Sequence, residues 1–236
     1  MNSEASDEFG WRESVYILLD CSASMGTETL GEIQEQIRAL SMYFLSDPTI
    51  IESLRTSLIT FDSHVRQVFP LTSILSKSIT THLDVPLVAQ GTSSLGAALL
   101  FLDETINLEV KKIKQSCKGD NAPYTIIITD AQPTDQWQEP LAYFVKKHYH
   151  KPFFVIPSHI EEASYTALEL HYSSLVEIER NKNKIPPENI WRGRNHFSGR
   201  INHLPNSVPL CYSVYEFVQS ITKWSEGLHV FTRSLQ

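Results

Sequence analysis

Cysteine is scarce in this sequence of 236 residues. The three cysteines are Cys21, Cys117 and Cys211, and no two of them have the C-x-x-C spacing of a zinc site. This pattern excludes a disulfide framework as the basis of the fold. It is typical of proteins from a reducing compartment, and we expect a cytoplasmic protein.

Positive net charge and long apolar runs are also lacking. The formal net charge is −7 and the isoelectric point is about 5.7, which argues against a protein built to hold nucleic acid or an anionic membrane. No apolar run approaches the ~20 residues that cross a bilayer. The segment Met1–Gly10 is acidic and polar, unlike the basic and apolar start of a secretory signal. We therefore expect a soluble protein without a membrane partner.

The motifs of several enzyme classes are missing. The sequence has no G-x-x-x-x-G-K-[ST] phosphate loop. No histidine pattern surrounds Ser22 or Ser24 that would turn either hydroxyl into a nucleophile. The histidines of the last third match no standard zinc spacing. The sequence therefore predicts no catalysis.

The sequence is rich in alternating apolar strands and amphipathic helices. Hydrophobic residues make up 42% of the chain, which is enough for a substantial core. The alternation predicts an α/β fold with a doubly wound, mostly parallel sheet and helices on both faces. The segments 54–61 and 65–71 are close enough to form a hairpin, which would supply one antiparallel edge strand. The other strands are expected at 15–20, 123–130 and 151–157, and the main helices at 30–45, 95–114 and 136–149.

The apolar strand Val15–Leu19 is followed by a group of oxygen-bearing side chains. Asp20, Ser22 and Ser24 occupy every second position before the next helix. In open α/β sheets, ligands bind outside the carboxyl ends of the strands. One carboxylate and two hydroxyls form a hard-oxygen set that suits Mg²⁺. The alternative interpretation is that these side chains only cap the helix that follows.

Two further segments favour the metal interpretation. The turn Gly91-Thr92-Ser93 opens a second helix, and the strand Tyr124–Thr129 ends at Asp130. Together the three segments resemble the von Willebrand factor A (vWA) domain and its metal-ion-dependent adhesion site (MIDAS), whose pattern is D-x-S-x-S, then T, then T-D-G. The resemblance implies a Rossmann-like fold and one bound Mg²⁺, with Mn²⁺ or Ca²⁺ as alternative ions. The residues that would surround the ion are Asp20, Ser22, Ser24, Thr92 and Asp130.

A narrower resemblance is to the TerY-like branch of the family, which is associated with bacterial tellurium resistance and stress response. It is carried by Leu19–Met25, Ile59–Asp62, Gly91–Ser93 and Thr129–Asp135, and the segment Tyr215–Trp224 resembles the closing helix of that branch. The sequence departs from the pattern at two positions, because Gln90 replaces the usual first Gly and Ala131 replaces the Gly after the strand-end Asp. Neither change removes a ligand. We predict a backbone conformation at Ala131 that tolerates a β-carbon.

The resemblance implies a protein-binding scaffold rather than an enzyme. In the family, the vacant coordination position of the ion takes an Asp or Glu side chain from a partner protein. The TerY-like branch resembles a scaffold that works with a protein kinase and a PP2C-type phosphatase, so these are the expected partner classes. The alternative is a metal-dependent phosphoester hydrolase in which Asp20, Asp62 and Asp130 hold the metal. For Asp62, a simple turn-forming role is the other interpretation.

We expect a single vWA domain at 14–236, preceded by a flexible lead-in at 1–13. Its last third should contain an irregular, basic insertion at 158–211. The segment 181–203 has a positive net charge, opposite in sign to that of the whole chain, because it contains five Lys and Arg residues and only one acidic residue, Glu188. Two interpretations remain open, an anion or acidic-partner site around Trp191–Arg194 and a solvated insertion. A nucleic-acid-binding module built on this segment is a third hypothesis, which the overall acidity opposes.

Overall fold

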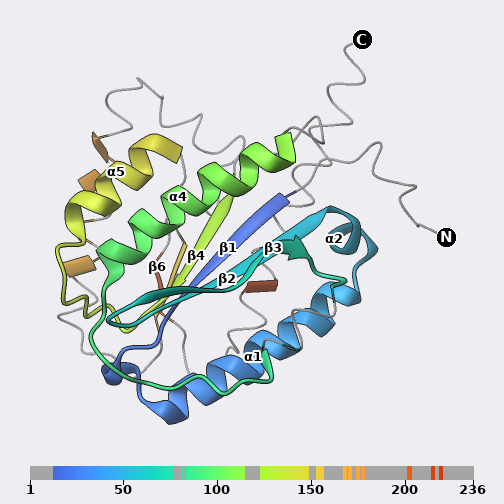
Figure 1. Ribbon diagram of the computed structural model, residues 1–236, viewed down its shortest axis with the longest axis horizontal. Helices are drawn as coiled ribbons and strands as arrows, with labels where there is room; N and C mark the ends of the chain where they lie inside the picture. Colours follow the sequence, from blue (N-terminus) through green and yellow to red (C-terminus); the bar gives the residue numbers. More distant parts are fainter. Residues whose placement is uncertain are drawn as a thin grey trace.

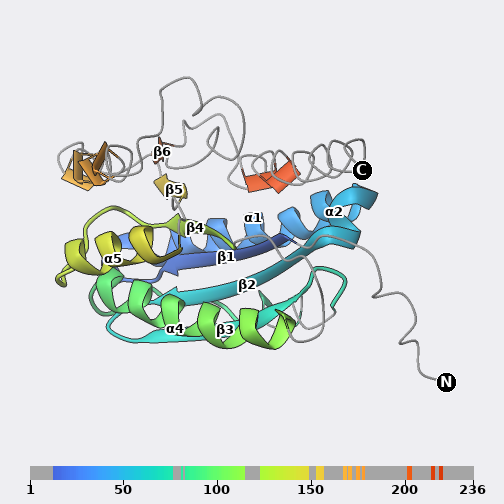
Figure 2. The same ribbon diagram turned by 90° about the horizontal axis from the view of Figure 1, so that it is seen from above.

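The computed structural model describes residues 13–76, 81, 83–114, 123–148, 153–156 and 201–203. It also describes positions 167–168, 170–171, 174–175, 177–178, 214–215 and 218–219. Its centre is a six-stranded sheet with the strand order β3-β2-β1-β4-β5-β6, which Figure 2 shows from β3 at the bottom to β6 at the top. Only the β2–β3 pair in this sheet is antiparallel. The predicted doubly wound, mostly parallel α/β fold with one antiparallel edge strand is confirmed.

The strands lie close to the segments that the sequence predicts. The hairpin partners 54–61 and 65–71 correspond to β2 and to all but the last two residues of β3. The bounds of the strands are β1 Glu13–Asp20, β2 Leu54–Phe61, β3 Val65–Ser73, β4 Tyr124–Ile128, β5 Phe153–Ile156 and β6 Ile201–His203.

Helices cover both faces of the sheet, with α1 on one face and α4 and α5 on the other (Figure 1). The helix α1 ends at Leu45. The short α2 begins shortly after it, with Asp47 as its N-cap and Pro48 as its first residue. Asp47 accepts the N–H of Thr49 at 3.1 Å, and Pro48 occupies the first turn, where a missing N–H costs nothing. The helices are η1 Ala23–Met25, α1 Thr27–Leu45, α2 Pro48–Ser53, α4 Leu95–Lys114 and α5 Gln138–His148.

The central strand β1 divides the core in two. Alternate residues of a strand point to opposite faces, so Ile17 and Leu19 join the cluster that contains Leu30 and Ile37 of α1. Tyr16 and Leu18 join the cluster on the other face with Leu99 and Leu102 of α4 and Leu141 of α5. All eight residues of β1 are buried. The strand is therefore fixed on both faces and along both edges, and its carboxyl end is a rigid base for a site.

The helix α1 also holds the segment that leads into α4. The buried side chain of Gln34 donates to the carbonyls of Leu83 and Val85 at 2.6 and 2.7 Å. Its oxygen accepts the N–H of Leu87 at 3.1 Å. All three bonds go to backbone groups that no strand partner satisfies, so Gln34 takes the place of a neighbouring strand for this segment.

The last third of the chain contains an element that the sequence pattern misses. Ile201–His203 form β6 and pair in parallel with β5, although the pattern places them in an irregular insertion. Three residues are too few for the period-2 alternation that marks a strand. The remainder of the basic segment, 181–200, lies outside the described residues, and so does the expected lead-in up to residue 12. No described helix has both the length and the apolar character needed to cross a bilayer.

Candidate metal centre at the carboxyl edge of the sheet

The loop after β1 is the centre of the candidate site. β1 is paired in parallel with β2 on one side and β4 on the other, so the three strands end at the same edge. In Figure 1 this edge lies at the left, where α1 and α4 also begin. The Cys21 N–H donates to Phe61 O at 2.7 Å and the Ala23 N–H donates to Gly91 O at 3.1 Å. The segment that contains Thr92 is therefore joined directly to the Asp20–Ser24 loop.

Asp20 is fully buried and accepts three hydrogen bonds. Its Oδ1 accepts the N–H of Ser22 at 2.9 Å. Its Oδ2 accepts the hydroxyls of Ser93 at 2.7 Å and Thr129 at 2.8 Å. A carboxylate has about four lone-pair directions, and the Ser22 hydroxyl also acts on this one. Asp20 thus joins all three site segments and retains little capacity for a further ligand.

The pKa of Asp20 is shifted upward. Burial raises it, and the hydrogen bonds from Ser93, Ser22 and Thr129 act in the opposite direction without cancelling the effect. A buried carboxylate without a cationic partner is costly in its charged form. A cation close to Asp20 would lower that cost, which is one reason why this donor set suits a divalent metal.

The two serines after Asp20 do not act as helix caps. Ser22 precedes η1 and Gly26 precedes α1, and neither cap position makes a side-chain hydrogen bond to its helix. The hydroxyls of Ser22 and Ser24 instead lie 3.1 Å from each other, one buried and one exposed. The capping interpretation is therefore wrong for the serines. Their oxygens form a pair that reaches from the buried carboxylate to the surface.

Asp130 supplies a second carboxylate at the end of β4. It is 2% exposed, and its Oδ1 accepts the N–H of Gln132 at 3.1 Å. Its Oδ2 is buried and has no hydrogen-bond partner among the described residues. An orphaned, buried carboxylate oxygen is unfavourable unless something binds it. The donor set therefore fits a hard divalent cation on an observation independent of the sequence motif.

Thr92 lies on the exposed side of the site, in the turn before α4. Its Oγ1 is 3.1 Å from Ser63 Oγ, and its N–H donates to the same oxygen at 3.0 Å. The preceding Gly91 has a φ of 67°, and a β-carbon there would lie 2.4 Å from Ser63 Oγ. Both the backbone conformation and the close approach require glycine at this position.

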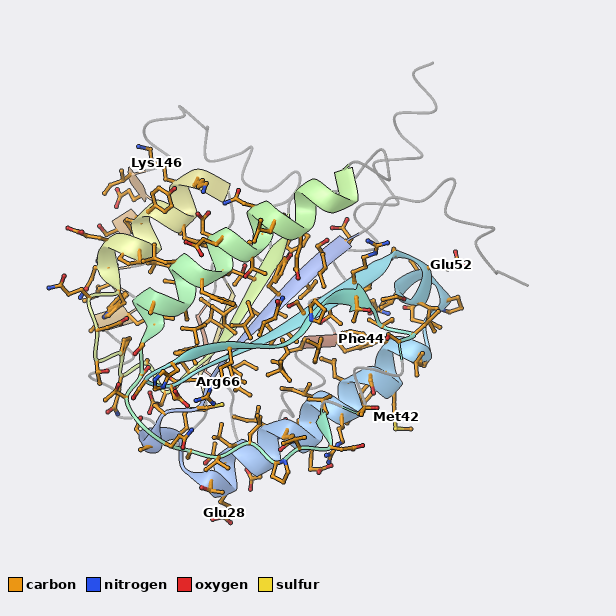
Figure 3. All side chains as sticks on the ribbon, viewed as in Figure 1. Glu28, Met42, Phe44, Glu52, Arg66 and Lys146 are labelled. Carbon is orange, nitrogen blue, oxygen red and sulfur yellow. The ribbon has the colours of Figure 1, made fainter. Side chains whose placement is uncertain are left out.

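Asp62 has the turn-forming role that the sequence left as one of two interpretations. Its Oδ1 accepts the N–H of His64 at 2.7 Å, and its Oδ2 accepts Gln90 Nε2 at 3.2 Å. The Arg66 guanidinium is 3.4 Å from the carboxylate. Figure 3 shows Arg66 and Glu52 at opposite ends of the sheet. Burial acts to raise the pKa of Asp62, but these hydrogen bonds and charges outweigh it and the pKa is lowered. The second role, at a metal, has no further support.

The prediction for Ala131 is wrong. Ala131 has a φ of 62°, which is the left-handed region that a β-carbon disfavours. Its N–H donates to Thr129 Oγ1 at 3.2 Å, and the side chain is buried in the core cluster below α4 and α5. The turn after β4 thus keeps the conformation of a glycine turn although it has lost the glycine. Tertiary contacts hold it there.

The loop after β4 also anchors the start of α4. Thr134 donates from its N–H and its hydroxyl to Ser93 O, at 2.8 and 3.0 Å. Asp135 accepts the N–H groups of Gly96 and Ala97 at the first turn of α4. These four hydrogen bonds fix the backbone on either side of Ser94. They therefore help to set where Thr92 lies.

The structure brings the predicted residues together to different degrees. Asp20, Ser22 and Ser24 form a continuous hydrogen-bonded group, and Thr92 and Asp130 lie on the two loops bonded to it. No group of three or more His, Cys, Asp or Glu side chains suited to a metal occurs among the described residues, so any ion here would depend on hydroxyls. Ser93 and Thr129, which hold Asp20, were not assigned roles from the sequence. Their only signal is their position beside Thr92 and Asp130.

These features define an α/β domain with a polar site at the carboxyl edge of its sheet. A family model of the von Willebrand factor type A domain matches residues 14–169. The match covers more than half of the chain, so the chain belongs to this family. Domains of the family are often metal-dependent protein-interaction modules. No sequence among the curated proteins matches the chain.

Solved structures share the fold at low sequence identity. The SpRpn10 VWA domain is 13% identical with a TM-score of 0.55, and the match covers 86% of this chain and 93% of that one. A von Willebrand factor type A protein from Catenulispora acidiphila is 11% identical with a TM-score of 0.54, and the match covers 90% of this chain and 42% of that one. The pilus adhesin SpaC from Lactobacillus rhamnosus GG has the same identity and TM-score, and the match covers 75% of this chain and 30% of that one. The chain thus spans less than half the length of the last two proteins.

Proposed function

We propose that this protein is a metal-dependent protein-binding module whose site is a MIDAS. In this proposal, Asp20, Ser22, Ser24, Thr92 and Asp130 surround one divalent cation. The preferred ion is Mg²⁺, since all donors are hard oxygens and the set contains two carboxylates and three hydroxyls. Mn²⁺ and Ca²⁺ are the alternative ions.

One observation carries this proposal, the buried and unpartnered Oδ2 of Asp130. Asp62, which follows β2, uses both of its oxygens, since Oδ1 accepts the His64 N–H and Oδ2 accepts the side-chain amide of Gln90. Asp130 uses one oxygen, which accepts the Gln132 N–H, and leaves the other buried without a partner among the described residues. Its neighbour Thr129 donates to Asp20, which joins this strand end to the Asp20 loop. A cation at this point would satisfy the orphaned oxygen and offset the buried charge of Asp20.

The residues would divide the work. The hydroxyls of Ser22, Ser24 and Thr92 would ligate the ion as neutral donors, and Asp20 would orient the Ser22 loop and compensate charge. Since only two carboxylates face the ion, it would keep electrophilic character at any open coordination position. An Asp or Glu side chain of a partner protein is the natural group to fill that position, because it adds a negative charge and a hard oxygen.

We further propose a TerY-like setting for this module, with a protein kinase or a PP2C-type phosphatase as partner in a bacterial stress response or tellurium resistance. Only the motif resemblance supports this part. We also propose a cytoplasmic location and a single vWA domain spanning 14–236. The β6 strand supports the domain assignment, because residues 201–203 extend the same sheet.

The hydrolase alternative has less support. It needs Asp62 as a metal ligand together with Asp20 and Asp130. Asp62 already holds the His64 N–H and the Gln90 amide, and it lies 3.4 Å from the Arg66 guanidinium, whose positive charge would oppose a metal ion at the same carboxylate. No described feature favours catalysis over binding at this edge.

The direct test is a titration of the purified chain with Mg²⁺ or Mn²⁺ by calorimetry. Asp130→Asn keeps the shape and removes the charge, so we expect the affinity for the ion to fall about 10–100-fold. The matched control is Glu52→Gln, an exposed carboxylate at the opposite end of the sheet from Arg66 (Figure 3), which should leave the affinity unchanged. A wild-type chain that binds neither ion at millimolar concentration would overturn the proposal.

The partner can be sought with the same chemistry. The tagged chain is incubated with the lysate of its own cells, with Mg²⁺ or with EDTA, and the experiment is repeated with Ser22→Ala and Thr92→Ala. We expect a captured protein that is lost with EDTA and with both variants. Capture that is equal under all conditions would remove the metal from the mechanism.

A further inference from the structure

The turn between β2 and β3 touches the Thr92 loop at three alternate positions. Gln90 donates through Nε2 to Asp62 Oδ2 at 3.2 Å. Thr92 bonds to Ser63 through its amide and its hydroxyl. Ser94 donates its N–H to Asp62 O at 3.3 Å. The residue between the last two, Ser93, points the other way and donates to Asp20.

The contact between Thr92 and Ser63 is a two-point grip. Thr92 N–H and Thr92 Oγ1 both lie within hydrogen-bond distance of one oxygen, Ser63 Oγ, at 3.0 and 3.1 Å. When Thr92 donates its hydroxyl hydrogen to Ser63, the lone pairs of Thr92 Oγ1 stay free for a cation. A cation on that oxygen would polarise the O–H group and strengthen its bond to Ser63. The contact therefore holds Thr92 Oγ1 in one position, from which it can ligate a cation when Thr92 is the donor.

Gln90 gives the same turn a second hold on the loop. The oxygen that receives its amide belongs to a carboxylate that is almost fully buried and is fixed by the His64 N–H. The backbone N–H of Gln90 also donates to Cys21 O at 2.9 Å. A glycine at position 90, as in the family pattern, would keep the backbone bond and lose the bond to Asp62. Gln90, where the loop departs from the family pattern, thus adds a side-chain hydrogen bond to the β2–β3 turn.

We propose that the β2–β3 turn, with Ser63 as its main contact, is a positioning clamp that holds Thr92 ready to bind the ion. Ser63 itself is a positioning residue and acts through Thr92. The inference rests on the proposed function, because it assigns Thr92 to the ion. The clamp reduces the conformational freedom that Thr92 would lose on binding, so its effect should appear in the affinity for the ion.

The test compares Ser63→Ala with Ser63→Thr and Ser73→Ala in the full chain. Ser63→Ala removes the grip at an exposed position, and we expect Mn²⁺ affinity measured by calorimetry to fall about three- to tenfold. Ser63→Thr keeps the hydroxyl and should restore the affinity to within about twofold of wild type. Ser73→Ala removes a hydroxyl that accepts the Leu75 N–H at the far end of β3, and it should not change the affinity.

A second readout separates the clamp from a general loss of structure. Hydrogen exchange of the Thr92 amide, followed by NMR without metal, should be faster in Ser63→Ala, while amides of β1 keep their rates. Unchanged Mn²⁺ affinity or unchanged Thr92 exchange in this variant overturns the clamp and leaves the proposed function standing. A wild-type chain that binds no Mn²⁺ overturns the proposed function and, with it, the assignment of the clamp to a metal ligand.

Discussion

The carboxylate of Asp135 caps the first turn of α4, where its Oδ1 accepts the N–H of Gly96 at 3.1 Å. Its Oδ2 accepts the next N–H, that of Ala97, at 3.0 Å. The cap comes from the loop after β4 rather than from the residue that precedes the helix. It therefore fastens two segments that are far apart in the chain and satisfies two of the four free N–H groups of the helix start.

Removing this cap should destabilise the fold. We expect Asp135→Ala to lower the free energy of unfolding by about 1–2 kcal/mol, because two N–H groups lose their acceptor. Urea denaturation followed by circular dichroism measures the change. The control Asp84→Ala removes an exposed carboxylate and should cost no more than about 0.5 kcal/mol. Equal effects of the two variants would show that the cap contributes nothing.

Gly96 should not tolerate a methyl group, whereas Gly31 should benefit from one. A β-carbon at Gly96 would lie 2.7 Å from Gln136 O and 3.1 Å from Trp137 Cα, both backbone atoms. Gly31 lies in α1 with open space around it. We expect Gly96→Ala to lower the melting temperature and Gly31→Ala to raise stability by about 1 kcal/mol. A Gly96→Ala variant as stable as wild type would contradict the close packing of α4 on the loop after β4.

The left-handed conformation of Ala131 should make Ala131→Gly stabilising. Glycine adopts a φ near 62° without the penalty of a β-carbon, and we expect a gain of about 0.5–1 kcal/mol. The matched control is Ala39→Gly inside α1, which should lose about 1 kcal/mol. Thermal unfolding of both variants in EDTA keeps metal effects out of the comparison. A loss at position 131 as large as that at position 39 would contradict the strained turn.

The lowered pKa of Asp62 predicts a defined pH dependence. The folded protein holds the carboxylate ionised below its ordinary pKa of 3.8, so the unfolded chain binds more protons in that range. The stabilisation by Asp62 is therefore present above about pH 4 and is lost as the pH falls through the folded pKa. We expect Asp62→Asn to cost about 1–2 kcal/mol at pH 7 and progressively less below pH 4. Urea titrations at several pH values would measure this, and a constant difference would contradict it.

Much of the fold follows from local pattern. The apolar run Val15–Leu19 could only be buried on both faces, and it is the central strand. The pair β2 and β3 had the short turn that demands a hairpin. The strand β6 could not be predicted, because three residues carry no periodicity and depend on pairing with β5.

The site was predictable as a set of positions but not as a network. The order of Asp20, Thr92 and Asp130 along the chain follows from the motif, and the strand ends bring their segments together. The roles of Ser93 and Thr129 depend on which way each hydroxyl turns, which only the packing decides. The conformation of Ala131 was mispredicted for the same reason. Local preference disfavoured it, and tertiary contacts outweighed that preference.

The three hydrogen bonds of Gln34 have a mechanical consequence. The helix α1 begins three residues after Ser24, and through Gln34 it also grips the segment 83–87 that leads to Thr92. The two segments of the candidate site, the Ser22–Ser24 loop and the one that leads to Thr92, are therefore both attached to α1. A shift of α1 along its axis would displace both segments together. The position of this helix and the geometry of the candidate site are therefore coupled.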